Sequence, residues 1–152
     1  MCAALMFVIG CSKGNAPPKL ADPVPMEGTV KTTDGKPIVG ATVIFHPKTQ
    51  TQFHGAVGFT DDTGKYVLES DVGDGKTKKG IVPGQYSVTV NRLVKPDGTT
   101  LKRDPNVPPM NVGAKEEMPM KYASVNEMGL TFDVPAAGGT FDITIDMSAP
   151  QI

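Results

Sequence analysis

Hydrophobic and polar residues alternate with a period of two along most of the chain after residue 25. In 85–91 the alternation places Tyr86, Val88 and Val90 on one face, and it is equally regular near the C-terminus. This period is typical of strands with one buried and one solvated face. We therefore predict strands at residues 26–32, 41–46, 56–60, 65–70, 85–91, 130–134 and 141–147. Seven strands without a helical stretch predict an all-β sandwich.

Turn residues separate the predicted strands. Asp34-Gly35 before Pro37 and the run 61–64 (Asp-Asp-Thr-Gly) carry residue types that favour tight turns. The stretch 137–139 (Ala-Gly-Gly) is expected to join the last two strands as a hairpin loop. The core side is expected to include Ala41, Val43, Phe45, Tyr66 and Leu68.

Two segments interrupt this rhythm. Residues 71–79 are rich in Gly and Lys and are expected to form an exposed loop. Residues 93–123 are too long for an ordinary connection and contain several prolines, so this segment is expected to be either functional or disordered. We predict a projecting hairpin around Asp97-Gly98, then an irregular stretch, and then a segment, 119–122, that docks back on the body.

Near the N-terminus, residues 3–9 form an apolar run that is followed by Gly10 and Cys11. This order matches a bacterial lipobox, in which the cysteine thiol receives a diacylglycerol. We expect residues 1–10 to be a lipoprotein signal peptide that is truncated at its start, because the basic n-region is missing. The alternative is a buried N-terminal strand. Cys2 and Cys11 are the only cysteines, so the body cannot form a disulfide.

A proline-rich tether follows the lipobox at residues 12–25. Extended at about 3.1 Å per residue, it would lift the domain roughly 40 Å from the lipid. No other apolar run approaches the ~18–20 residues that span a bilayer, so we expect an anchored protein. Ser12 is not the aspartate that retains some lipoproteins at the inner membrane, which favours the outer membrane over other extracytoplasmic surfaces. Residues 26–152 then form the folded domain.

Composition agrees with a single globular domain. The chain has 152 residues and a formal net charge of −1, without a basic field for nucleic acid. Its 17 glycines and 14 prolines fall between apolar stretches, which indicates many turns.

Four segments together resemble the carboxypeptidase regulatory-like domain: 27–30 (Glu-Gly-Thr-Val), 34–43 (from Asp34-Gly35 to Val43), 60–66 and 83–90. The resemblance implies a seven-stranded, transthyretin-like (prealbumin-like, Ig-like) β-sandwich. The later stretches 119–122 and 129–131 are similar to small lipoproteins abundant in planctomycete-type bacteria. The resemblance implies a fold and a location but no activity.

Catalytic motifs are absent from the sequence, and we expect neither an enzyme nor a cofactor. Transthyretin-like hydrolases end in a Tyr-Arg-Gly-Ser signature, whereas this chain ends in 147–152 (Met-Ser-Ala-Pro-Gln-Ile). No metal site is predicted. His46 and His54 are weak candidates because a third ligand is lacking. Asp61, Asp62, Asp71 and Asp74 could offer oxygens to Ca²⁺, although turn formation explains the first pair without metal.

Carbohydrate binding is the main alternative function. Sugar sites usually rely on exposed aromatic rings, yet the chain has no tryptophan and three tyrosines, of which two are predicted in the core. The basic residues Lys76, Lys78, Lys79, Lys95, Lys102 and Arg103 are expected to be loop charges that could meet glycans or lipid head groups. We expect a non-enzymatic, membrane-anchored accessory or protein-interaction module of the cell envelope, or alternatively a carbohydrate-binding module. Its partner would contact the 93–123 segment or an exposed sheet edge.

Overall fold

The computed structural model describes residues 21–49, 55–71, 76–101, 108–127 and 129–150. Within these ranges the chain is mostly β-sheet, as predicted, and only short helical turns occur. The strands are β1 Met26–Thr32, β2 Thr42–Pro47, β3 Ala56–Phe59, β4 Lys65–Val67, β5 Glu69–Asp71, β6 Thr77–Lys79, β7 Gly84–Asn91, β8 Leu93–Val94, β9 Lys115–Glu116, β10 Leu130–Val134, β11 Gly139–Thr140 and β12 Ile143–Ile145. The helical segments are η1 Pro109–Val112, α1 Met120–Ala123 and η2 Val125–Glu127. The predicted count of seven strands is therefore not confirmed.

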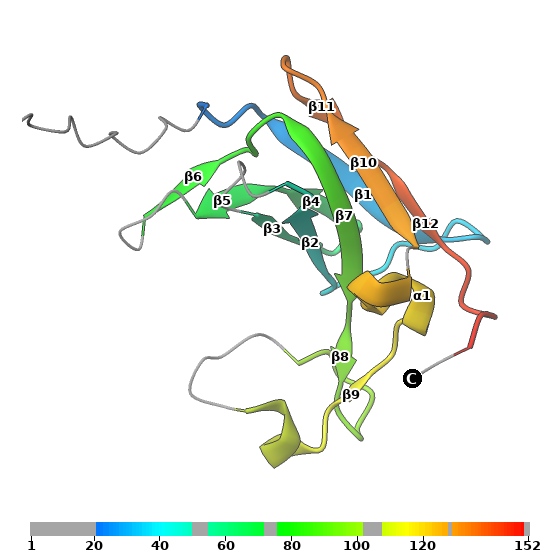
Figure 1. The fold of residues 1–152 in the computed structure, drawn as a ribbon. Coiled ribbons are helices and arrows are strands. Elements are labelled where there is room, and N and C mark those ends of the chain that lie inside the picture. Colours follow the sequence, from blue (N-terminus) through cyan, green and yellow to red (C-terminus); the bar gives the residue numbers. More distant parts are fainter. Residues whose placement is uncertain (1–20, 50–54, 72–75, 102–107, 128, 151–152) are drawn as a thin grey trace, which may run out of the picture.

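Two main sheets organise the body (Figure 1). The larger has the order β10-β7-β2-β3-β5-β6, with antiparallel neighbours throughout. In the smaller sheet β1 pairs antiparallel with β4 and parallel with β11 and β12. Side chains from both sheets belong to one hydrophobic core, so the sheets pack face to face.

One predicted strand, 65–70, divides between the two sheets. Its first part, β4, pairs with β1, and its second part, β5, pairs with β3. The change occurs at Leu68, which is fully buried and whose N–H donates to the carbonyl of Met26 at 2.9 Å. Leu68 is therefore a core residue at the point where the chain passes from one sheet to the other.

The predicted hairpin between the last two strands is wrong. β10 lies in the larger sheet beside β7, whereas β11 and β12 lie beside β1 in the smaller sheet. Residues 137–139 therefore carry the chain from one sheet to the other. Gly138 has φ 75°, and the Gly139 N–H donates to the Pro25 carbonyl at 3.0 Å. Alternation predicted which face of each strand is buried, but it carries no information on the neighbouring strand.

The predicted core positions are confirmed. Ala41, Val43 and Phe45 are fully buried, as are Tyr66, Leu68, Tyr86 and Val90, and Val88 is nearly so. The Phe45 ring makes edge-on contacts with Tyr86, Phe132 and Phe141 at centroid distances of 5.9 to 6.3 Å. Such edge-to-face pairs add stabilisation beyond the area they bury.

The segment 71–79, predicted as a loop, contributes a strand where the structure describes it. β6 pairs with β5 at the edge of the larger sheet, with Lys79 opposite Glu69 and Lys78 opposite Ser70. All three residues of β6 are exposed. Lysines on an edge strand discourage unwanted pairing with other chains, which explains these charges without a ligand.

Residues 93–101 and 108–118 form a projection beyond the end of β7, as predicted (Figure 1). Its hairpin turns at Asp97-Gly98, where the Gly98 N–H donates to the Lys95 carbonyl at 2.9 Å. β8 also pairs with β9 on the return path. The chain then docks back through α1, in which Tyr122 is buried and its hydroxyl accepts the N–H of Asp146 at 3.1 Å.

The N-terminal segment and the projection meet β7 at opposite ends. Val24 exchanges hydrogen bonds of 2.8 and 2.9 Å with Ile81, just before β7 begins at Gly84. β7 ends at Asn91, where the projection starts. Eight residues in a strand extend about 26 Å, so the two features lie on the order of that distance apart.

Candidate functional site

The predicted lipidation residue, Cys11, lies outside the described residues, and so do Cys2, His54, Asp74, Lys102 and Arg103. The described chain enters the body at Val24. No helix in the described ranges is long and apolar enough to cross a membrane.

His46 lies on β2 and is half-buried. Its Nε2 is 3.0 Å from the Thr89 hydroxyl, and burial lowers the pKa of its imidazole below the usual 6.5. Among the described residues no three His, Cys, Asp or Glu side chains gather where they could hold a metal ion. His46 is therefore a hydrogen-bonded strand residue in this part of the structure.

Asp61 closes the turn before β4. One of its carboxylate oxygens accepts from the Thr63 N–H, the Thr63 hydroxyl and the Lys65 N–H at 2.7 to 3.0 Å. These hydrogen bonds, led by the Thr63 hydroxyl, lower the pKa of Asp61. The carboxylate thus stabilises the turn, which was the alternative to calcium binding at Asp61 and Asp62.

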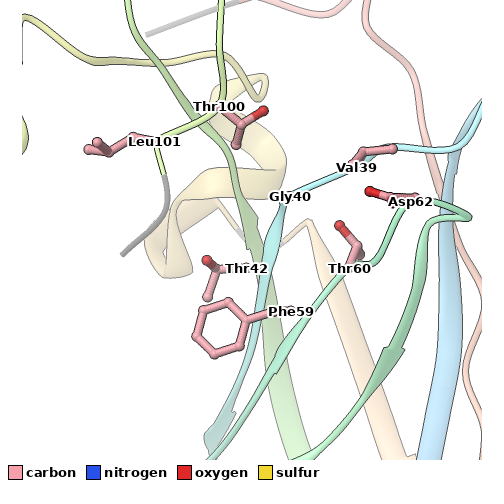
Figure 2. A pocket seen from close by; sticks show the side chains of 8 residues that line it. All are labelled: Val39, Gly40, Thr42, Phe59, Thr60, Asp62, Thr100 and Leu101. Carbon is pink, nitrogen blue, oxygen red and sulfur yellow. The ribbon is translucent and has the colours of Figure 1, made fainter. Parts of the chain in front are cut away.

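A surface groove of about 460 Å³ lies where the start of β2, the end of β3 and the projecting hairpin meet. In Figure 2 Leu101 extends from the hairpin at the left, the Phe59 ring lies at the lower edge of the groove, and Asp62 lies at the right. The lining residues are Val39, Gly40, Thr42, Phe59, Thr60, Asp62, Thr100 and Leu101. Most of this surface is hydrocarbon, and Asp62 supplies its single formal charge.

The two walls of the groove touch at Gly40 and Thr100. Gly40 has φ 69°, and a Cβ built on it would lie 2.7 Å from the Thr100 methyl carbon. A larger residue would be strained by its backbone and would push the hairpin away. The segment from 39 to 42, which leads into the predicted strand at 41–46, thereby brings the projection against the body.

Arg92 holds these walls together. Its Nε donates to the Val39 carbonyl at 2.8 Å, and one terminal nitrogen donates to the Thr100 hydroxyl at 3.2 Å. The other terminal nitrogen forms an ion pair with Glu117. A planar guanidinium can make all these contacts at once, whereas an ammonium cannot.

Glu116 completes the base of the projection. Its two carboxylate oxygens accept from the Arg92 N–H at 2.8 Å, the Met118 N–H at 2.9 Å and the Asn91 amide at 3.0 Å. Sequence reasoning missed this network. The sequence signal for this network was a polar pair at the end of an alternating strand, Asn91-Arg92, and an acidic pair, Glu116-Glu117, that begins 24 residues after Arg92.

Phe59 lines a second hollow as well. That hollow is shallower and is lined by Val57, Phe59, Asp61, Lys65, Val67 and Glu69. Phe59 and Val67 are 54% and 45% exposed, which is high for large apolar side chains. The two hollows therefore form one surface centred on Phe59, and we call it the Phe59 surface.

The tyrosines do not contribute to this surface. Tyr66, Tyr86 and Tyr122 are all buried, and the hydroxyls of the first two donate to backbone carbonyls of Phe141 and Val82 at 2.6 and 2.7 Å. Burial raises the pKa of Tyr86 to about 12 and raises that of Tyr66 further, with a smaller contribution from the charge of Asp142. Both hydroxyls are therefore protonated donors that brace the core.

Comparisons with known proteins add little. No protein-family model matches the chain, and no curated protein matches it. The crystal structure of the major pilin subunit of Bacillus cereus is similar at 13% sequence identity with a TM-score of 0.39. The match covers 82% of this chain and 29% of the pilin chain, so this chain spans less than a third of that protein. The resemblance to the carboxypeptidase regulatory-like family consequently stands on its motif residues alone.

Proposed function

We propose that this chain is a lipid-anchored, non-enzymatic interaction module on the outer membrane or another extracytoplasmic surface of a bacterium. The observation that carries the proposal is the polarity of the fold. The segment that follows the predicted lipidation site joins one end of β7, and the projection with its groove lies at the other. An anchor at Cys11 would therefore hold the groove away from the lipid.

Three sequence features support the anchor. A lipobox ends at Cys11, a proline-rich tether follows it, and the folded body has no cysteine. The tether gives the domain reach, since extended proline-rich chain behaves as a semi-rigid spacer. These features belong together in a surface lipoprotein, and a buried N-terminal strand would need none of them.

The groove favours binding over chemistry. Its lining offers one carboxylate and threonine hydroxyls, without a histidine or cysteine to act as base or nucleophile. The Thr60 hydroxyl is already committed, since it accepts the N–H of Ala41 at 2.7 Å. Such a surface is suited to recognising a partner.

The anchor is tested with Cys11→Ala, and Cys2→Ala provides the matched control because it also removes a leader thiol. We expect the Cys11 variant to lose acyl labelling and to leave the membrane fraction, while the control keeps both. Unchanged labelling and fractionation of the Cys11 variant would refute the anchor.

The interaction role is tested by photocrosslinking in native membranes. A photoreactive residue replaces Leu101 at the groove or, as control, the exposed Thr140 at the tether end. We expect a discrete envelope protein to crosslink at position 101 and not at position 140. Equal capture at both positions, or none at either, would contradict the proposed orientation.

The finer fold assignment is also a proposal. We infer a variant of the transthyretin-like, carboxypeptidase regulatory-like sandwich because the motif residues occupy the positions such a framework needs. Asp34-Gly35 and Asp61–Gly64 form turns, and Tyr66 and Tyr86 fill the core. An experimental structure whose sheets separate these motif residues would refute it. Carbohydrate binding receives less support, because all three tyrosines are buried.

A further inference from the structure

We propose that the groove beside Phe59 binds a lysine or arginine side chain of a protein partner. The aliphatic stem would lie against Phe59 and Leu101, and the charged head would reach Asp62. This inference deepens the proposed interaction function and rests on it in one respect, namely that the partner is a protein.

The groove has the two kinds of surface that a long basic side chain needs. Phe59 from β3 and Leu101 from the hairpin offer hydrocarbon, and the side chain of Asp62 lies across the groove from them at the right of Figure 2. Lysine and arginine bury their methylene stems along apolar surface while their heads keep a polar partner. A side chain that crosses the groove would meet carbon first and a negative charge at its end.

Asp62 is available for such a contact. No basic residue in the described ranges lies within ion-pair distance of its carboxylate, and no hydrogen bond occupies it there. The neighbouring Asp61 differs, because its carboxylate is committed to the turn. Two adjacent aspartates thus have separate roles, one structural and one facing the groove.

The charge around the Phe59 surface is acidic. Asp61, Asp62 and Glu69 contribute three carboxylates to the lining, against a single lining lysine at position 65, and Lys79 stands opposite Glu69 on the neighbouring strand β6. Lys65 is paired with Glu27 at 3.1 Å, outside both hollows. A cationic partner is therefore complementary to this surface, and an anionic one is repelled.

The groove is held in shape before any partner arrives. The Arg92 guanidinium bridges the Val39 carbonyl on one wall and the Thr100 hydroxyl on the other. Its own charge is balanced by Glu117, so it does not cancel the charge of Asp62. A preformed groove reduces the entropy lost when a partner binds.

A glycan fits the same surface less well. Phe59 is the one exposed aromatic side chain among the described residues, and no second ring stands beside it to form a stacking platform. The groove also has few free hydrogen-bonding groups for sugar hydroxyls. We therefore argue for a protein segment, and a glycan is a result that the test can return.

The test uses the full chain in non-ionic detergent and a fluorescent peptide, Gly-Leu-Lys-Leu-Gly, measured by anisotropy. Matched peptides carry Met or Glu in place of Lys. We expect Asp62→Asn and Phe59→Ala each to weaken binding at least about fivefold, and the Met and Glu peptides to bind at least about fivefold more weakly. Raising the salt from about 0.05 to 0.5 M should weaken binding to the wild-type chain but not to the Asp62 variant.

Two controls match these variants. Asp133→Asn removes an exposed carboxylate on β10 outside the groove, and Met110→Ala removes an apolar side chain that is 89% exposed in the projection. Both should bind the peptide as the wild-type chain does. Since the Asp62 side chain makes no hydrogen bond or ion pair with any described residue, its variant should remain folded, and circular dichroism checks this.

The proposal is overturned if the lysine peptide does not bind, if the Asp62 variant binds it equally, or if an envelope oligosaccharide binds at Phe59 instead. These results are distinguishable from failure of the proposed function. A crosslinked envelope protein at position 101 without peptide binding would leave the interaction module standing and remove the basic-side-chain groove. Peptide binding together with unchanged membrane association of the Cys11 variant would remove only the anchor.

Discussion

Removal of the Arg92 guanidinium should loosen the projection while leaving the sheets intact. Arg92→Gln eliminates the hydrogen bonds to Val39 and Thr100 and the ion pair with Glu117. The backbone contact from the Arg92 N–H to Glu116 is unaffected, because it does not involve the side chain. The base of the hairpin would therefore weaken without detaching completely.

The size of the expected destabilisation follows from how deeply the contacts of the Arg92 side chain are buried. Hydrogen bonds to charged groups contribute about 1.5–3 kcal/mol each when buried, whereas exposed ion pairs contribute about 0–1 kcal/mol. The side chains of Arg92 and Glu117 are 23% and 36% exposed, so the contacts belong between these limits. We take about 2 kcal/mol for the whole side chain, which corresponds to roughly a 30-fold shift in a local opening equilibrium.

Amide hydrogen exchange measures the opening equilibrium of the projection directly. The Leu101 N–H donates to the Leu93 carbonyl within the hairpin, and the Glu117 N–H donates to the Arg92 carbonyl at its base, at 2.8 and 2.9 Å. Both amides should exchange roughly 30-fold faster in the variant, while amides of β2 in the core stay unchanged. Lys115→Gln, which removes an exposed cation from the same projection, is the control.

The role assigned to Arg92 fails if exchange at both amides is unaffected, because the guanidinium would then not hold the walls together. It also fails if the β2 amides accelerate equally, because the contacts would then stabilise the whole fold and not the projection. A double-mutant cycle with Glu117→Gln separates the ion pair from the other contacts, and we expect a coupling of about 1 kcal/mol.

Three further predictions concern the body. Tyr66→Phe should lower the free energy of unfolding in urea by about 1–2 kcal/mol, since the Phe141 carbonyl loses its donor. Gly28→Ala should prevent stable folding, because the added Cβ would lie 1.9 Å from the Phe141 carbonyl oxygen. Gly35→Ala is the control: its Cβ meets open space, and the variant should lower the free energy of unfolding by only about 1 kcal/mol because φ is 83°. The pKa of Asp61 in the folded state lies below its usual 3.8, so the unfolded state binds the proton first as the pH falls. The free energy of unfolding should therefore decrease as the pH drops from about 4 through the folded-state pKa. Asp61→Asn should flatten this part of the curve when the urea midpoint is measured against pH.

Which residues are buried could be predicted from the sequence because burial is local to a strand. The alternation of Tyr86, Val88 and Val90 fixes the core face wherever the strand pairs, and all three are buried. Turns were equally local, since Asp61 and Gly64 form theirs within four residues. Pairing is different, because it depends on residues distant in sequence. The assumed hairpin at 137–139 was wrong because nothing local shows that β12 pairs with β1.

The groove could not be predicted either, because its shape also depends on contacts between residues distant in sequence. A cluster of neighbouring polar residues, such as the adjacent aspartates at 61 and 62, is visible in the sequence. The groove instead depends on Arg92 joining Val39 and Thr100, which lie 53 and 8 residues away along the chain. Its preformed shape therefore belongs to the fold. An alignment that preserved Arg92, Gly40 and Asp62 together while the rim varied would distinguish a functional groove from a merely structural contact.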